Sequence, residues 1–203
     1  ENAELGDARL IIDAGQHHFA LAILNNHGNT FIALEFYQLK PETRDHDLSL
    51  LIKEHPLLSI HYKDVLVAFN TREAILMPGK LYVPGQDTYC IYRVPGFLHQ
   101  EVSQNFKSGH YWHIYSSILQ VLEKRASTLP VSFIYVNFYP NQVLVTVMKE
   151  KVCQLIQIFP YDIPEDVSYH LLNLSEQLEL DNSEIPLYAS GLIDISSALY
   201  AEM

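Results

Sequence analysis

Residues 131–159 read VSFIYVNFYPNQVLVTVMKEKVCQLIQIF, and the fold prediction starts from this segment. Three apolar runs of strand length lie in it, and β-branched and aromatic residues are frequent in each of them: Val131–Phe138, Val143–Met148 and Val152–Phe159. The segments YPNQ and KEK between the runs have the composition of short turns. The stretch therefore predicts three consecutive strands joined by two hairpins.

A helix and a fourth strand follow these three strands. Pro164 is suited to the first helical position, where its missing N–H costs nothing, and apolar residues then recur at helical spacing as far as Leu178. Leu187–Ala189 begins a short fourth strand, and Ser190–Gly191 turns into a last helix. The order in this part of the chain is three strands, a helix, a strand and a helix.

The same order occurs earlier in the chain. The pattern predicts strands and a helix in the following places: strands at Arg9–Gly15, His18–Leu24 and Thr30–Leu39, a helix at Asp45–His55 and a strand at Asp64–Phe69. A loop at Asn25–Asn29 joins the second strand to the third. Arg9 and Val131 are 122 positions apart, and so are Asp64 and Pro186. A repeat of this length indicates a duplicated fold.

The segment between the copies also has structure. It predicts a strand, a helix, a second strand and a second helix, at Thr88–Val94, Phe97–Phe106, His110–Tyr115 and Ser116–Ala126. We assign this segment to the first half as an insertion, so that the halves are residues 1–129 and 130–203. The aromatic residues of the segment fit either its own core or a protein interface: Tyr89, Tyr92, Tyr111, Trp112 and Tyr115.

Composition excludes several functions. The formal net charge of −11 argues against binding nucleic acid or anionic lipid. No apolar run approaches the roughly 20 residues needed to span a bilayer, and the acidic N-terminal residues do not resemble a signal peptide. Cys90 and Cys153 lie in apolar strand patterns, where we expect buried thiols rather than a disulfide or a metal site. We therefore expect a cytoplasmic protein.

Four stretches of the chain resemble an uncharacterised bacterial family of unknown function: Phe31–Leu39, His61–Tyr82, Phe159–Asp181 and Pro186–Asp194. The resemblance implies an α/β fold of the actin-like ATPase type, made of two ribonuclease-H-like units (βββαβα) with mixed sheets and flanking helices. Members of the family have a longer stretch after the segment that matches Ile75–Tyr82. We therefore expect residues to be absent near Gly85. Because the sequence stops at Met203 within a predicted helix, we also expect the natural chain to continue beyond it.

In actin-like ATPases the nucleotide lies between the halves, and one hairpin from each half wraps the phosphates. The turns need Gly for close approach, and an Asp on each hairpin holds Mg²⁺ through water. Asp13 and Gly15 are similar to the first of these motifs. Gln16, His17 and His18 follow in place of small, hydroxyl or lysine residues. The alternative for Asp13 and Gly15 is an ordinary turn at a strand end.

The corresponding turn of the second half departs further from the motif. Asn137 replaces the carboxylate, Tyr139 is bulky where Gly is expected, and Pro140 lacks an N–H. The adenosine-contacting turn would include Gly191, with one glycine instead of two. Departures therefore occur at three separate elements: the first hairpin, the second hairpin and the adenosine-contacting turn. Because phosphoryl transfer depends on positioning and on the metal, they make hydrolysis improbable. We expect no catalytic residues and no bound cofactor.

Two other groups of residues have side chains that are typical of functional sites. His17–His18 and the pair His110 and His113 suggest zinc, but each pair has opposite parity along a strand, so we expect no metal site. Glu35 is a carboxylate among apolar residues, and we expect it to face solvent or the cleft between the halves.

Three functional hypotheses remain at this stage. The first is a non-catalytic actin-like scaffold that binds a protein partner or itself. The second is an ATP-binding switch or kinase-like protein with an atypical Mg²⁺–ATP site around Asp13 and Gly15. The third is a small-molecule sensor that uses the cleft between the halves. The candidate cleft residues are common to all three hypotheses: Asp13, Gly15, Gln16, His18, Asn137, Tyr139 and Gly191.

Overall fold

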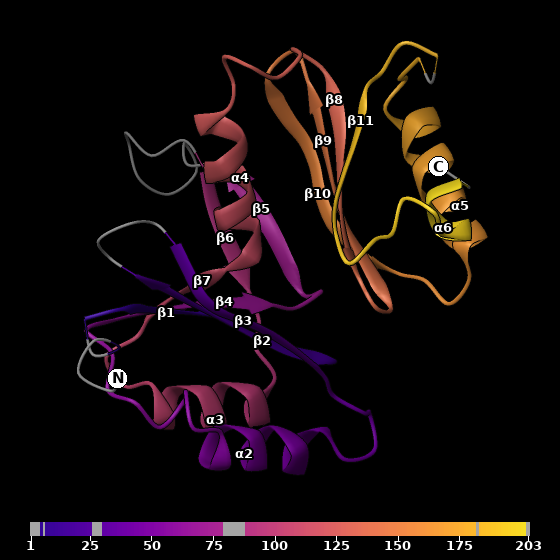
Figure 1. The fold of residues 1–203 in the computed structure, drawn as a ribbon. Helices are drawn as coiled ribbons and strands as arrows, with labels where there is room; N and C mark the ends of the chain where they lie inside the picture. Colours follow the sequence, from indigo (N-terminus) through magenta and orange to yellow (C-terminus); the bar gives the residue numbers. More distant parts are fainter. Residues whose placement is uncertain (1–4, 6, 26–29, 79–87, 182, 202–203) are drawn as a thin grey trace. The chain divides into compact units, whose positions relative to one another are not determined.

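The computed structural model describes residues 5, 7–25, 30–78, 88–181 and 183–201. The loop predicted at residues 25–29 therefore lies outside the described residues except for Asn25, as do the expected gap near Gly85 and the chain end at Met203. The chain divides into two compact units, Glu1–Ile118 and Leu119–Met203, each built around a mixed sheet (Figure 1).

The first unit contains a sheet with the strand order β3-β2-β1-β4-β7. β1, β2 and β3 are antiparallel neighbours, whereas β4 runs parallel to β1 and β7 runs parallel to β4. The strands have the following bounds: β1 Arg9–Gly15, β2 His18–Asn25, β3 Thr30–Gln38, β4 Asp64–Asn70 and β7 His110–His113. The order places the ends of β1 and β4 side by side.

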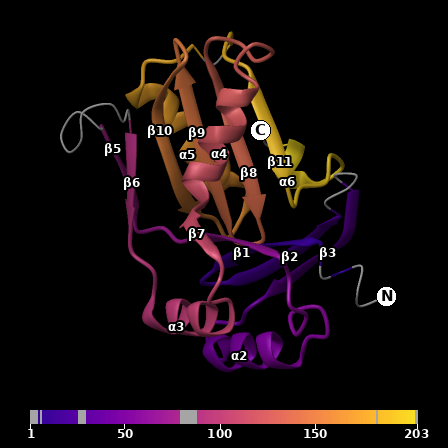
Figure 2. The same cartoon turned by 90° about the vertical axis from the view of Figure 1, so that its left-hand side faces the viewer.

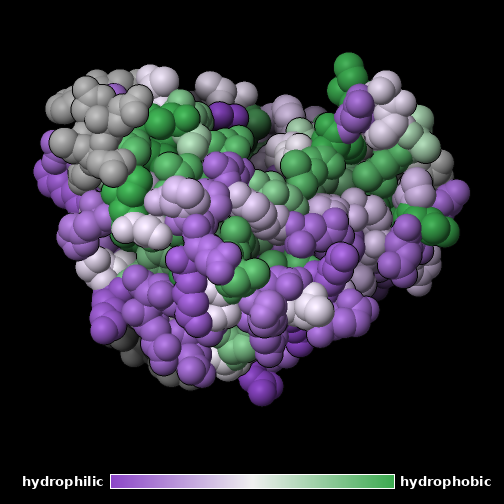
Figure 3. Space-filling view, turned by 60° about the horizontal axis from the view of Figure 1, so that its bottom comes forward, coloured by the Kyte–Doolittle hydropathy of each residue, from purple (hydrophilic) through white to green (hydrophobic). Residues whose placement is uncertain are grey.

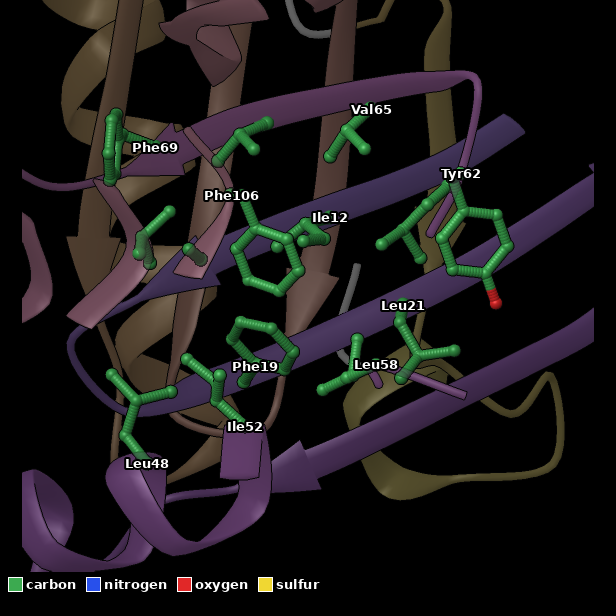
Figure 4. Packing of buried hydrophobic residues seen from close by; sticks show 14 of the residues in the cluster. Ile12, Phe19, Leu21, Leu48, Ile52, Leu58, Tyr62, Val65, Phe69 and Phe106 are labelled. Atoms are coloured by element: carbon green, nitrogen blue, oxygen red, sulfur yellow. The ribbon is translucent and has the colours of Figure 1, made fainter. Parts of the chain in front are cut away.

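Two helices cover one face of this sheet, α2 (Arg44–Glu54) and α3 (Gly96–Asn105) (Figure 1). Alternate strand residues point toward them, because successive side chains of a strand lie on opposite faces. Phe19 of β2 is fully buried and lies close to the α2 residues Leu48 and Ile52 (Figure 4). The opposite face of the sheet carries Asp13 and His18.

A two-stranded hairpin extends the first unit. β5 (Ala74–Pro78) pairs antiparallel with β6 (Thr88–Tyr92), and the two strands lie side by side apart from the five-stranded sheet (Figure 2). β5 was not predicted as a strand. The segment predicted as an insertion also contributes β7 to the main sheet. Its aromatic residues contribute to packing, since Tyr92 and Tyr111 both lie against Phe69.

The second unit repeats this design with the strand order β10-β9-β8-β11. Its elements have these bounds: β8 Phe133–Tyr139, β9 Gln142–Lys149, β10 Val152–Pro160, α5 Pro164–Gln177, β11 Leu187–Gly191 and α6 Ala198–Ala201. β8, β9 and β10 are antiparallel, and β11 is parallel to β8. Val143, Val145 and Val147 of β9 form a buried core with α5 residues, among them Val167 and Leu171.

The two units share one topology: three antiparallel strands, a crossover helix, and a strand parallel to the first. α2 makes the crossover in the first unit and α5 makes it in the second. This confirms the predicted duplicated α/β fold. α4 (Ile114–Lys124) contains the boundary between the units.

Candidate functional site

Asp13 is held by two side chains where β1 meets its neighbours. His18 lies at the start of β2, and its Nε2 donates to Asp13 Oδ1 over 3.1 Å. Asn70 lies at the end of β4, which the register places opposite Gly15, and its Nδ2 donates to Asp13 Oδ2 over 3.3 Å. His18 and Asn70 are both buried. Both carboxylate oxygens of Asp13 are therefore occupied by groups of the same chain.

Gly15 gives room to the His18 ring. A Cβ built on Gly15 would lie 2.4 Å from His18 Cε1 and 2.6 Å from its Nδ1, which is too close for any side chain. The His18 ring also stacks on Phe36 of β3, with 5.5 Å between the ring centroids. The space next to the Gly15 backbone is thus filled by a buried imidazole.

A second buried imidazole, His113, lies near this cluster at the end of β7. Its Nε2 donates to the Thr71 carbonyl oxygen over 3.0 Å, and its Nδ1 accepts from the Tyr115 N–H over 3.3 Å. One donor and one acceptor fit the neutral ring. Burial lowers the pKa of His113 to about 4, although the hydrogen bond to Thr71 and the charge of Asp13 act in the opposite direction. Sequence reasoning considered His113 only as a metal ligand.

Gln16 does not join the cluster around Asp13. It lines a separate pocket of about 220 Å³ together with Arg44, Glu73, Arg93 and other residues. Arg93 is paired with Glu73 at 3.3 Å, and Arg44 lies over the Phe97 ring. The charged groups of this pocket are therefore largely engaged with one another.

The three candidate residues of the second unit also lie together. Ser190 Oγ donates to Asn137 Oδ1 over 2.8 Å. Gly191 adopts φ +87°, and a Cβ there would lie 2.4 Å from the Phe138 carbonyl oxygen and 2.7 Å from Asn137 Oδ1. Tyr139 is buried, and its carbonyl oxygen accepts from Tyr161 Oη over 2.7 Å. The turn is packed and hydrogen-bonded within its own unit.

The two hairpins are structurally equivalent. Two residues separate β1 from β2, and two separate β8 from β9. Asp13 and Asn137 each lie two positions before the end of their strand, so Asn137 stands where the first unit has a carboxylate, and Tyr139 stands in the position of Gly15. Each unit thus has one cluster of candidate residues, and the second has lost both the charge and the glycine of the first.

The chemistry available to the cluster in the first unit is limited. A carboxylate and an imidazole can exchange a proton, but His18 is buried and its Nε2 faces Asp13. Neither hydrogen bond to the Asp13 carboxylate comes from a serine or cysteine that could act as a nucleophile. Within the part of the chain that the structure describes, no three His, Cys, Asp or Glu residues are arranged to hold a metal ion.

Comparison with protein families gives a match over the full length. The model of a family described as "Protein of unknown function (DUF3822)" matches residues 1–88 and 82–203. No curated protein matches the chain. None of the helices in the described ranges is both long enough and apolar enough to cross a membrane.

Comparison with solved structures gives strong likeness in fold at low sequence identity. A Bacteroides thetaiotaomicron protein with an actin-like ATPase fold and unknown function superposes with a TM-score of 0.84 at 14% identity, over 100% of this chain and 89% of that one. The ethanolamine utilization protein EutJ from Carboxydothermus hydrogenoformans gives 0.57 at 10% identity, over 96% and 80%. A chain of a PilM–PilN type IV pilus biogenesis complex gives 0.56 at 13% identity, over 98% and 86%. The fold is that of the actin-like ATPases.

Proposed function

This chain belongs to the DUF3822 family of proteins of unknown function, and we propose that it is a non-catalytic actin-like scaffold whose task is to bind a partner protein. The observation that carries the proposal is the position of His18. Its imidazole fills the space beside Gly15 and engages Asp13, the two residues that resemble a phosphate and Mg²⁺ motif.

The residues present do not fit Mg²⁺–ATP. A phosphate needs the backbone of the first turn to be open to it, yet a buried side chain is packed against Gly15. Mg²⁺ prefers hard anionic oxygen, and in the second unit Asn137 offers only a neutral amide oxygen that already accepts from Ser190. Pro140 supplies no N–H donor in that turn. The two hairpins are thus filled by groups of the same chain.

Protein binding is the function that we infer for this fold when no nucleotide is bound. The similar fold found in the PilM–PilN complex belongs to a protein assembly, which supports a protein partner for this chain by analogy of fold alone. Self-association would use the same scaffold. The free thiols Cys90 and Cys153 support a reducing, cytoplasmic location.

Titration calorimetry with Mg²⁺–ATP tests the proposal. We expect no measurable heat of binding for the wild-type protein at millimolar nucleotide. The Asp13→Ala variant examines the candidate motif, and Asp162→Ala, which removes an exposed carboxylate of the second unit, is its control. Micromolar binding that is lost in Asp13→Ala and kept in Asp162→Ala would overturn the scaffold and establish the ATP-binding switch.

A further inference from the structure

β3 is an edge strand that is only partly protected against pairing. Within the described residues it is hydrogen-bonded to β2 alone. Phe31, Ile32 and Leu34 on this strand are 60%, 49% and 73% exposed. Natural edge strands are commonly blunted by lysine, proline or an inward-pointing charge. The sequence of β3, TFIALEFYQ, has neither lysine nor proline. Its one charged residue, Glu35, lies on the α2 side of the strand and is hydrogen-bonded to Tyr37, and the register with β2 shifts only between Ile23 and Leu24, at the N-terminal end of β3.

The free edge of β3 can be assigned from its register with β2. The Leu39 N–H donates to the His17 carbonyl oxygen over 2.8 Å, just beyond the two strands. Hydrogen-bonded pairs alternate along an antiparallel ladder, so Tyr37 and Glu35 also direct their backbone groups toward β2. The N–H and C=O groups of Leu34 and Phe36 therefore point away from β2, toward the open edge.

A groove adjoins the end of this strand. It has a volume of about 420 Å³ and lies between the end of β3 and α2. Its apolar lining comes from Leu39, Leu50, Leu51 and Pro56, and the carboxylates of Asp47 and Glu54 also line it. Among the described residues, no lysine or arginine lines the groove. Figure 3 shows hydrophilic side chains over much of the side of the molecule where α2 and α3 lie.

Polar contacts fix the groove in shape. Tyr37 donates its hydroxyl hydrogen to the Glu35 carboxylate, and its oxygen lies 2.9 Å from His55 Nε2. His55 Nε2 also lies 2.9 Å from Glu35 Oε2. His55 is the residue after α2, so these contacts tie β3 to the C-terminal end of the helix. The groove does not need to form when a ligand arrives, which lowers the ordering cost of binding.

We propose that the β3 edge and the groove beside it bind an extended segment of a partner protein, in which apolar residues alternate with lysine or arginine. This inference rests on the proposed scaffold function and names its binding surface. The segment pairs with the outward backbone groups of Leu34 and Phe36. Side chains of a strand alternate in direction. The side chains on one face of the bound segment therefore enter the groove, and those on its other face cover Phe31 and Leu34.

The acidic charge of the groove indicates which kind of segment binds there. A basic segment complements Asp47 and Glu54 in the groove and the net charge of −11 on the whole chain. Pairing of β3 with β3 of a second copy would instead bring two sets of these carboxylates together. The carboxylates of this chain thus favour a basic partner segment over a second copy of the chain.

The test uses the full chain and a synthetic nine-residue peptide in which Lys and Val alternate, with a Glu–Val peptide as its acidic counterpart. In ¹⁵N–¹H spectra we expect the Lys–Val peptide to shift amide signals of β3 and α2, and the Glu–Val peptide to leave them in place. Leu34→Lys should weaken binding at least tenfold. Leu172→Lys, at an exposed leucine of α5, should leave the affinity unchanged. Equal binding by Leu34→Lys overturns the proposal.

Two N-methylated forms of the peptide test strand pairing while the protein stays unchanged. One form is methylated at its Val backbone nitrogens and the other at its Lys backbone nitrogens. Each form therefore lacks the N–H groups along one edge of the extended peptide. Pairing with β3 requires that only one of them loses affinity, by tenfold or more. Equal affinity of the two forms shows attraction by charge alone and overturns the assignment of the β3 edge.

Sedimentation velocity separates the remaining outcomes. A dimer of the wild-type chain that Leu34→Lys dissociates would make a second copy the occupant and overturn the basic partner. A monomer that binds neither peptide would overturn the β3 surface and leave the scaffold proposal standing. Mg²⁺–ATP binding in calorimetry would overturn the scaffold proposal itself, whatever the peptides do.

Discussion

The imidazole of His18 lies against Gly15, and the missing side chain of Gly15 is what makes room for it. Glycine is expected in a phosphate-binding turn because the backbone must approach the ligand closely. Here the same absence of a Cβ serves a contact within the chain. A sequence that resembles a nucleotide motif is thus compatible with a purely structural use of its glycine.

This contact predicts that substitutions of Gly15 and His18 have non-additive effects on stability. Gly15→Ala should lower the free energy of unfolding by about 1–3 kcal/mol, because its Cβ meets a buried ring that cannot move aside freely. His18→Ala should also destabilise, since it removes a buried ring and one hydrogen bond to Asp13. In the double variant the clash is gone, so the total loss should be smaller than the sum of the single losses by at least about 1 kcal/mol. Urea unfolding of the four proteins measures this difference, and strictly additive losses would contradict the contact.

Gly191 in the second unit needs glycine for a different reason. Its φ of +87° lies in a region that L-residues avoid, and its Cβ position is only 2.4 Å from a backbone oxygen. We expect Gly191→Ala to cost at least about 2 kcal/mol and to lower the melting temperature by about 5 °C or more. Differential scanning calorimetry measures the shift.

Gly96 provides the matched control for this substitution. It is the first residue of α3, and no heavy atom lies within 4 Å of a Cβ built there. Gly96→Ala should therefore leave the melting temperature unchanged or raise it slightly, since alanine reduces the freedom of the unfolded chain. Equal losses from both substitutions would show that the backbone geometry of Gly191 is not the cause.

The duplicated order of strands and helices could be predicted from the sequence because its signals are local. Turn residues separate the apolar runs 131–138, 143–148 and 152–159, and the observed strands β8, β9 and β10 differ from these runs by at most two residues at either end. β5 gave no such signal. It is five residues long, ends in proline and pairs with β6, which begins ten positions after it. A short run of this kind becomes a strand through its pairing with β6 and carries little signal of its own.

The candidate sites depended on contacts between distant residues, which one sequence does not reveal. Asp13 and Gly15 could be singled out by their motif, whereas Asn70 reaches Asp13 only because β4 lies beside β1. Glu35 was expected to face solvent or a cleft. Its position opposite Leu21 instead places it on the face covered by α2, where Tyr37 and His55 contact it.

His113 makes stability depend on pH. Its pKa falls from 6.5 in the unfolded chain to about 4 in the folded protein, so between these values the unfolded state binds more protons. The stability that the neutral ring contributes is fully present above pH 6.5 and is lost as the pH falls toward 4. We expect this residue alone to lower the free energy of unfolding by about 2 kcal/mol between pH 7 and pH 5.

Urea unfolding of the wild type and of His113→Gln at pH 7 and pH 5 isolates this contribution. The variant is expected to be less stable at pH 7, because it loses the ring that bonds to Thr71, but its loss on acidification should be smaller by about 2 kcal/mol. The lowered pKa values of Asp166, Asp181 and Asp194 contribute only where these groups protonate, near pH 4 and below, and they are common to both proteins. An equal loss on acidification in both proteins would rule out a buried neutral His113.

The buried hydroxyl of Thr146 in β9 leads us to predict a stabilising substitution. Its side chain is fully buried, and among the described residues its Oγ1 has no hydrogen-bond partner. A buried hydroxyl without a partner costs about 1–3 kcal/mol relative to one that is satisfied. Thr146→Val keeps the shape, removes the hydroxyl and suits a strand, so it should raise the free energy of unfolding by about 1 kcal/mol. Thr128→Val is the control, since the exposed Thr128 Oγ1 donates to the Arg125 carbonyl oxygen and its removal should give no gain. Urea unfolding distinguishes the two variants, and a loss of stability in Thr146→Val would show that the Thr146 hydroxyl is satisfied in the folded protein.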